Sequence, residues 1–294
     1  MEVHQLRYAV AVADAGSFTA AAAALHVSQS GVSAQVARLE HELGLHLFER
    51  GARAVTATPA GDQLLVRMRG VLAALEDIRS TADQHLGLLR GHARIGAVAG
   101  LTWPAFIDAL VSLRAQHPEL EISLTEGLSL LLQQQVADGK LDVAVVSWAR
   151  APQPGLASWV ATEERLTAVV SHTHPWAAKT SLVADDLLEG EVICMAGGTG
   201  MRAAYEAMMH AEGHPAPVAW EVTLPSTVRA LAERGLGVGI VTSSLADGAD
   251  DLVHLPIRSR HGTSKLGVVW RDHPPAGPPT TAVVTSLRRH LARP

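Results

Sequence analysis

The stretch "ALHVSQSGVSAQVARLEHELG", residues 24–44, decides the fold of the first part of this chain. It follows the alanine-rich segment "GSFTAAAAALHV", residues 16–27. Alanine has the highest helix propensity and Ser17 is a favourable N-cap, which predicts a helix from Phe18 to about His26. Ser28 can cap a second helix that follows directly. The two segments therefore predict a pair of short helices separated by a compact turn.

The second helix of this pair has one apolar side. Hydrophobic residues recur at helical spacing and predict a buried stripe, formed by Val32, Val36, Leu39 and Leu43. Two short helices joined by a tight turn are typical of a helix-turn-helix. The sequence thus points to a small helical domain at the start of the chain.

The polar side of the second helix begins with small hydroxyls and an amide rather than bulk. In a helix that enters the major groove, Gln can pair with adenine and Ser can donate or accept a hydrogen bond. The free N–H groups at the helix start also suit a phosphate. The candidate DNA-contacting residues of this helix are Ser28, Gln29, Ser30, Ser33, Gln35 and Arg38. The alternative is that these residues only cap the helix and face solvent.

The next segment, "GLHLFERGARAVTATPAG", residues 44–61, predicts a two-stranded wing. Phe48 is an apolar anchor, and Arg50 and Arg53 lie near the expected tip. Arginines in that place can grip a phosphate or a minor groove beside the recognition helix. The head as a whole is not basic, so the expected affinity for DNA is modest and sensitive to salt.

Residues 6–61, "LRYAVAVADAGSFTAAAAALHVSQSGVSAQVARLEHELGLHLFERGARAVTATPAG", resemble the N-terminal winged helix-turn-helix of LysR-type transcriptional regulators. The resemblance implies DNA contacts by Gln29, Ser30, Ser33 and the wing arginines. The chain has Ala34 where the family often has a basic residue, and Gly31 where a small apolar residue is usual. These two departures leave the choice of operator open.

The same resemblance implies a transcriptional regulator rather than an enzyme, with no cofactor and no bound metal. The partners that it implies are double-stranded promoter DNA, a small-molecule effector and further copies of the chain, as a dimer or a dimer of dimers. It leaves RNA polymerase open as another partner.

The composition sets the frame for these expectations. The chain has 294 residues, of which 48% are hydrophobic, and a formal net charge of −5. This length allows two or three domains, and the charge balance does not by itself call for a nucleic-acid partner. The start shows neither a signal peptide nor a membrane span, so a cytoplasmic location is expected. A single cysteine, Cys194, excludes an intrachain disulfide.

A long amphipathic helix is expected over residues 62–89. Its apolar residues alternate at spacings of four and three, as the seam of a coiled coil requires, and they are Leu64, Met68, Val71, Leu75 and Ile78. This pattern predicts a dimer. The alternative is a single helix that packs on its own domain.

From Ile95 onward, β-rich apolar runs alternate with helical stretches, which predicts an α/β sheet with crossover helices. The predicted fold class is thus α/β, with a winged helix-turn-helix over 1–60, a linker helix over 61–90 and an effector domain over 91–294. By resemblance the effector domain is similar to type 2 periplasmic binding proteins. Its first lobe is expected at about 91–161 with 267–294, and its second at 162–266.

The candidate effector site lies at the ends of the predicted strands, because ligands of open α/β sheets bind outside the carboxyl ends of strands. Amides, hydroxyls and Arg202 would together suit a small carboxylate or another anion. Tryptophans would add an aromatic wall. The candidates are Gly100, Leu101, Thr102, Trp103, Ser129, Ser147, Trp148, Thr199, Gly200, Arg202, Thr223 and Ser226. Taken singly, each could instead be a helix cap or a packing residue.

Three competing interpretations are weaker. Residues 198–203 fit the dinucleotide pattern G-x-G-x-x-A, which would imply an NAD-dependent enzyme, but a lone match carries little weight. The spacings of His172 with His174 and of His210 with His214 could hold a metal, yet no Cys or carboxylate completes either set. Cys194 next to the cleft could be oxidised, although a buried apolar role is favoured.

Overall fold

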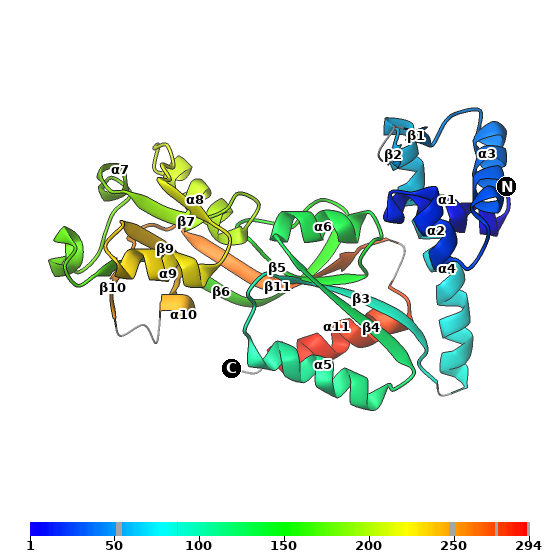
Figure 1. Ribbon diagram of the computed structural model, residues 1–294. Coiled ribbons are helices and arrows are strands. Elements are labelled where there is room, and N and C mark those ends of the chain that lie inside the picture. The colour runs from blue at the N-terminus through cyan, green and yellow to red at the C-terminus, as the bar shows by residue number, and fades with distance from the viewer. Residues whose placement is uncertain (51–54, 87, 247–250, 274–275, 293–294) are drawn as a thin grey trace. The chain divides into compact units, whose positions relative to one another are not determined.

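The computed structural model describes residues 1–50, 55–86, 88–246, 251–273 and 276–292, and its ribbon is shown in Figure 1. The chain divides into two compact units. The N-terminal unit comprises Met1–Leu89 with Asp138–Lys140, and the C-terminal unit comprises Arg90–Ala137 with Leu141–Pro294. Each unit has its own hydrophobic core.

Four helices and a short hairpin form the described part of the N-terminal unit. They are α1 (Val3–Ala15), α2 (Phe18–Ala24), α3 (Gln29–Leu43), β1 (Phe48–Arg50), β2 (Val55–Ala57) and α4 (Pro59–His85). Ser17 Oγ accepts from the Ala20 N–H and Ser28 Oγ accepts from the Gly31 N–H, so both predicted caps are confirmed. The first predicted helix ends at Ala24 rather than His26, because His26 adopts a left-handed φ of 54° that no helix continues.

The predicted apolar stripe of α3 packs into the core of the N-terminal unit. Val32, Val36 and Leu39 are fully buried, and Leu43 is partly buried against them. The Phe18 and Phe48 rings meet edge to face with centroids 6.0 Å apart. Burial of each such side chain contributes about 1.5–3 kcal/mol. The helix-turn-helix is therefore held by its own small core.

A buried carboxylate joins α3 to the hairpin. Glu40 Oε1 accepts from the backbone N–H groups of Leu47 at 2.7 Å and Phe48 at 3.2 Å. Thr58 Oγ1 donates to the His46 carbonyl and caps α4 by accepting from the Gly61 N–H. The chain at the start of β1 is therefore held by hydrogen bonds to Glu40 of α3 and to Thr58, which directly precedes α4.

Helix α4 has apolar residues that are buried near its start and others that are exposed further along. Leu65 and Met68 are buried in the core of the N-terminal unit, and Leu64 is partly buried against it. This placement corrects the assignment of Met68 to a dimer seam, because the first turns of α4 complete the core instead, while Leu64 keeps part of its side chain accessible. Further along the same helix, apolar side chains are 36–67% exposed, namely Val71, Leu75 and Ile78.

A nine-stranded sheet runs through the C-terminal unit in the order β4-β3-β5-β11-β6-β9-β7-β8, with β10 also paired to β6. The strands are β3 (Gly91–Val98), β4 (Leu120–Gly127), β5 (Val143–Trp148), β6 (Leu156–Ser171), β7 (Val192–Met195), β8 (Trp220–Val222), β9 (Val238–Thr242), β10 (Leu252–Pro256) and β11 (Thr263–Arg271). The β3–β4 and β7–β8 pairs are parallel, as crossover helices require, while β6 and β11 are antiparallel.

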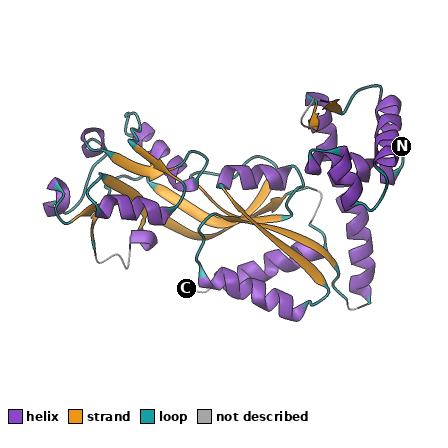
Figure 2. Cartoon of the chain, viewed as in Figure 1, coloured by secondary structure: helices purple, strands orange, loops and turns teal. Residues whose placement is uncertain are grey.

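Helices pack along this sheet (Figure 2). They are α5 (Pro104–Gln116), α6 (Ser129–Ala137), the 3-10 helix η1 (Pro175–Ala178), α7 (Asp186–Glu189), α8 (Gly200–Ala211), α9 (Pro225–Glu233), α10 (Ser243–Ala246) and α11 (Pro278–Leu291). We call the part with β3–β5, α5, α6 and α11 the first half, and the part with β7–β10 and α7–α10 the second half. Each half holds a separate hydrophobic cluster. No helix among the described residues is long and apolar enough to cross a membrane.

The long strands β6 and β11 connect the two halves. Their pairing shifts register where Leu266 faces Thr162 and Gly267 faces Val160, which leaves Ala161 as the extra residue of a bulge. A Cβ on Gly267 would lie 2.2 Å from the Trp159 carbonyl oxygen and 2.8 Å from the Trp148 ring, so the close approach needs glycine. Bulges bend a strand and re-aim side chains, and this one lies where the strands pass between the halves.

Candidate functional site

The exposed side of α3 carries most of the predicted DNA-contacting residues. Four of these residues are exposed, namely Ser28, Gln29, Ser30 and Arg38. The other two, Ser33 and Gln35, are partly buried. Gln35 Oε1 accepts from Gln5 Nε2 of α1 at 3.2 Å, so Gln35 is partly occupied within the protein. The first turn of α3 therefore presents its small polar groups to solvent.

The glycine at position 31 is explained by its close packing against the cap of α3. A Cβ at this position would lie 3.0 Å from Ser28 Oγ, the oxygen that caps α3. Any larger residue would press on this cap. The DNA contacts of the two predicted wing arginines stay predictions. Arg50 is the last residue of β1, and the structure describes its backbone only; Arg53 lies outside the described residues.

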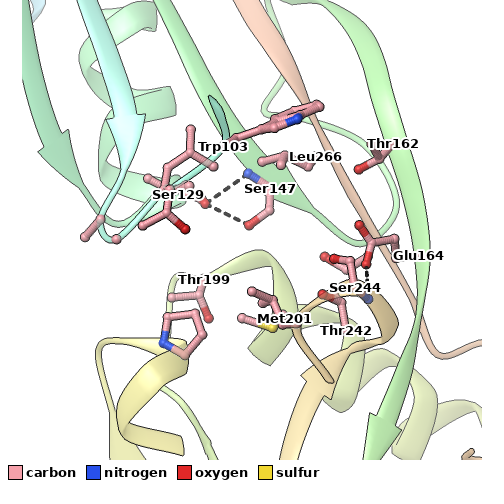
Figure 3. A pocket seen from close by; sticks show the side chains of 18 of the residues that line it. Trp103, Ser129, Ser147, Thr162, Glu164, Thr199, Met201, Thr242, Ser244 and Leu266 are labelled. Atoms are coloured by element: carbon pink, nitrogen blue, oxygen red, sulfur yellow. Dashed lines mark hydrogen bonds between the residues drawn. The ribbon is translucent and has the colours of Figure 1, made fainter. Parts of the chain in front are cut away.

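A cavity of about 720 Å³ lies between the two halves of the C-terminal unit. Both halves supply its walls: the loop before α5, the starts of α6 and α8, the end of β9 with α10, and the central parts of β6 and β11. Figure 3 shows Trp103, Leu266 and Met201 between two groups of polar side chains. A volume of this size suits a small organic ligand.

One polar group of the cavity joins the halves. Ser129 Oγ and Ser147 Oγ lie 3.1 Å apart, and the Ser147 N–H donates to Ser129 Oγ at 3.1 Å. Ser147 Oγ also accepts from the backbone N–H of Gly200 at the start of α8, at 3.1 Å. The Leu130 N–H donates to the Gly198 carbonyl nearby. These bonds pin the first turn of α8 to the first half.

The other polar group lies on the crossing strands β6 and β11 and on the neighbouring end of β9 and start of α10. Its lining residues are Thr162, Glu164, Thr242, Ser244 and Ser264. Glu164 Oε2 accepts from the Ser244 N–H at 3.0 Å, and Thr162 Oγ1 is buried without a hydrogen-bond partner among the described residues. Between the two polar groups the wall is mainly apolar.

Helices α5 and α9 begin at the cavity with proline at the first helical position. Pro104 and Pro225 line it, and the preceding N-cap residues, Trp103 and Leu224, make no side-chain cap. N–H groups at such helix starts suit acceptor atoms of a ligand.

The structure brings together most, but not all, of the predicted effector-site residues. Those that line the cavity are Gly100, Leu101, Thr102, Trp103, Ser129, Ser147, Thr199 and Thr223. Gly200 and Ser226 lie beside it without lining it. Two further candidates need correction.

Trp148 belongs to the hydrophobic cluster of the first half and is only 5% exposed, because β11 packs over its ring at Gly267. Arg202 does not line the cavity either. Its guanidinium forms ion pairs with Glu206 at 2.7 Å and with Glu221 at 3.0 Å, which directs its charge elsewhere. The expected anion therefore lacks its predicted basic side chain.

Lining residues on the crossing strands were missed by the sequence analysis. Thr162, Glu164, Ser264 and Leu266 lie inside β6 and β11, whereas the prediction searched for strands that lead into helices. In the sequence, these lining residues were indicated only by the expected boundaries between the lobes at residues 161–162 and 266–267. A ligand between the lobes must contact the strands that join them.

The dinucleotide and metal interpretations find no support in the geometry. At the start of α8, the Gly200 N–H is taken by Ser147, and a Cβ on Gly200 would lie 2.5 Å from the Ser147 carbonyl carbon, so a pyrophosphate has no room there. His174 Nδ1 accepts from the Trp176 N–H, and His214 pairs with Asp185 at 2.6 Å. Among the described residues, no cluster of three His, Cys, Asp or Glu side chains could hold a metal.

Cys194 lies in β7 and is fully buried. Burial raises the pKa of its thiol to about 12, well above the ordinary value of 9.0. The thiolate is the reactive form of cysteine, so burial and the raised pKa both disfavour reactions of this side chain in the folded protein.

Comparisons with known proteins agree with both units. Residues 3–62 match the family model "Bacterial regulatory helix-turn-helix protein, lysR family", and residues 86–292 match the model "LysR substrate binding domain". The chain is 29% identical to the uncharacterised HTH-type transcriptional regulator YnfL of Escherichia coli strain K12, over 99% of this chain and 98% of the relative.

The chain is also similar to two further proteins. The chain is 26% identical to the hydrogen peroxide-inducible genes activator of Dickeya chrysanthemi, over 99% of this chain and 96% of the relative. The solved structure of a full-length OxyR variant from Pseudomonas aeruginosa aligns with a TM-score of 0.76 at 24% identity, over 98% of this chain and 95% of that one. The second likeness shows a shared fold.

Proposed function

The chain belongs to the LysR family of DNA-binding transcriptional regulators, and on that premise we propose that a small molecule in the cavity between the two halves controls its action on promoter DNA. The family model that covers residues 86–292 shows the domain, and the 720 Å³ cavity supports the ligand. Members of this family are regulators of transcription rather than enzymes.

The single observation that carries this proposal is that both halves line one cavity. A ligand that contacts the first half through Ser129 and the second half through Thr242 favours the arrangement in which both contacts are made. A ligand shifts a conformational equilibrium only by its differential affinity for the two states. Contacts to both halves provide such a difference, since separation of the halves would break one set.

DNA binding itself is the task of the N-terminal unit. We propose that α3 enters the major groove and that its exposed first turn, with Gln29 and Ser30, meets base edges. The exposed apolar stripe on α4 supports pairing of two chains, which would present two recognition helices to paired half-sites. We propose that this action takes place in the cytoplasm, where bacterial promoter DNA lies.

A second candidate function, sensing of peroxide through a thiol, is suggested by the Dickeya chrysanthemi relative. The chain has one cysteine, and Cys194 is buried with a raised pKa. A reactive thiol needs exposure and a lowered pKa, and a disulfide needs a second cysteine. The cavity is therefore the better candidate for the sensing site.

The experiment that tests the proposal selects bound fragments from chromosomal DNA of the source organism and maps the protected region of each. Thr223→Trp places a bulky ring in the cavity, whereas Ser226→Trp places it at another exposed residue, outside the lining. We expect wild type and Ser226→Trp to give the same affinity and protected length, and Thr223→Trp to change one of them. Identical behaviour of all three proteins would refute control by the cavity, and failure to select any fragment would refute the regulator itself.

A further inference from the structure

We propose that Glu164 makes the cavity selective for ligands that carry a cationic amine, an inference that rests on the proposed function of the cavity. Among the described residues that line it, Glu164 is the one ionisable side chain, and this described lining contains no Lys, Arg or His. The described lining therefore contributes a single formal charge, which is negative.

The carboxylate of Glu164 is only partly satisfied by the protein. Its Oε2 accepts from the Ser244 N–H at 3.0 Å, while Oε1 has no donor among the described residues. Within the same described part of the chain, Glu164 also lacks an ion-pair partner. A carboxylate that loses water on ligand binding must regain its hydrogen bonds, and a cationic donor does this best.

The neighbourhood of Glu164 suits an ammonium group. Thr162 lies two residues earlier on β6, hence on the same face, and its Oγ1 is buried without a partner among the described residues. Thr242 and Ser244 line the cavity on the same side, as Figure 3 shows. An ammonium has three donors and no acceptor, so one carboxylate oxygen and two hydroxyls would satisfy it.

The rest of the cavity defines the body of the ligand. Trp103, Leu266 and Met201 form an apolar wall next to the charged end, which suits an aromatic or aliphatic skeleton. The uncapped starts of α5 and α9 suit neutral acceptor atoms, but they bring no charged side chain. A ligand whose only charge is a carboxylate would meet Glu164 without a basic partner, since Arg202 is paired with Glu206 and Glu221.

A purely structural role for Glu164 would be to hold the start of α10 through Ser244. Glu164→Gln separates the two roles, because the amide oxygen still accepts from the Ser244 N–H while the charge is lost. Glu163→Gln is the matched control. Glu163 is the neighbouring residue of β6, is exposed and does not line the cavity.

The test is titration calorimetry of the full chain with three probes that share a phenyl body: phenethylamine, phenethyl alcohol and hydrocinnamate. We expect the wild type to bind the amine about tenfold more tightly than the alcohol, as a charge-assisted hydrogen bond provides, and to bind hydrocinnamate more weakly than either. Glu164→Gln is expected to abolish the preference for the amine. Glu163→Gln is expected to retain it.

The proposal is overturned if the wild type fails to bind the amine at millimolar concentration, binds hydrocinnamate as well as the amine, or keeps its preference in Glu164→Gln. Fluorescence anisotropy with a selected promoter fragment separates this outcome from failure of the proposed function. An amine that binds through Glu164 but leaves DNA binding unchanged would contradict control by the cavity and leave the selectivity intact. A Thr223→Trp effect on DNA without any preference for the amine would contradict only the selectivity.

Discussion

The backbone N–H of Gly200 donates to Ser147 Oγ at 3.1 Å, so the start of α8 in the second half is bonded directly to the end of β5 in the first half. The same hydroxyl lies 3.1 Å from Ser129 Oγ. One edge of the cavity is thus closed by the protein's own hydrogen bonds. Relative movement of the halves must either keep this contact or break it.

This junction predicts an order of stabilities. Ser147→Ala removes hydrogen bonds and is expected to lower the free energy of unfolding by about 1 kcal/mol. Gly200→Ala is expected to cost more, because its Cβ would lie 2.5 Å from the Ser147 backbone. Gly197→Ala is the control, since nothing lies within 4 Å of a Cβ there. Chemical denaturation of the three variants checks the order, and a Gly200→Ala protein as stable as Gly197→Ala would contradict the close packing.

The recognition helix predicts two different DNA phenotypes. Gln29→Ala is expected to reduce discrimination between a selected site and random DNA by about 1–3 kcal/mol, because a lost bidentate base contact affects only the matching sequence. Arg38→Ala is expected to weaken binding to both DNAs alike and to lower the salt slope by about one, as loss of a phosphate contact does. Anisotropy titrations over a range of salt concentrations measure both. If the two variants behave alike, the assignment of base and phosphate roles is incorrect.

Helix α4 predicts a separation of stability from assembly. Ile78→Glu changes a side chain that is 67% exposed and is expected to weaken dimerisation while the protein stays folded. Met68→Glu buries a charge in the core of the N-terminal unit and is expected to destabilise that unit by several kcal/mol. Analytical ultracentrifugation reports the first effect and circular dichroism the second. A folded, fully dimeric Ile78→Glu protein would show that copies pair through another surface.

Cys194 predicts resistance to oxidation and a dependence of stability on pH. Because burial raises its pKa from 9.0 to about 12, the thiol should react with iodoacetamide only after unfolding, and peroxide should leave DNA binding unchanged. The raised pKa also means that the buried, protonated thiol contributes fully to the free energy of unfolding below pH 9. This contribution is lost as the pH rises toward 12, because the unfolded chain then ionises more readily than the folded protein. Cys194→Ser removes this titration and is the control. Rapid labelling of the native protein at neutral pH would contradict the burial.

The local features of the N-terminal unit were predictable from the sequence because each depends on neighbouring residues. Ser17 and Ser28 cap the helices that follow them, and the spacing of Val32, Val36 and Leu39 selects the face that is buried. Capping and helical periodicity are properties of a few consecutive turns.

Whether a side chain lines the cavity was decided by contacts that form only in the folded chain. Trp148 is covered at Gly267, and Arg202 is paired with Glu206 and Glu221. Outside the cavity, Met68 belongs to a buried cluster that also contains residues of α1 to α3. Glu164 was missed because a charged residue within a strand gives no periodic signal for a cavity.

The sequence by itself determined the helix-turn-helix, the alternation of strands and helices, and the family. Only the tertiary structure decided that Glu164, rather than Arg202, brings the charge to the cavity. The physical reason is that strand and helix propensities are local free energies, whereas the charge that a ligand meets depends on which ion pairs form after the strands have assembled.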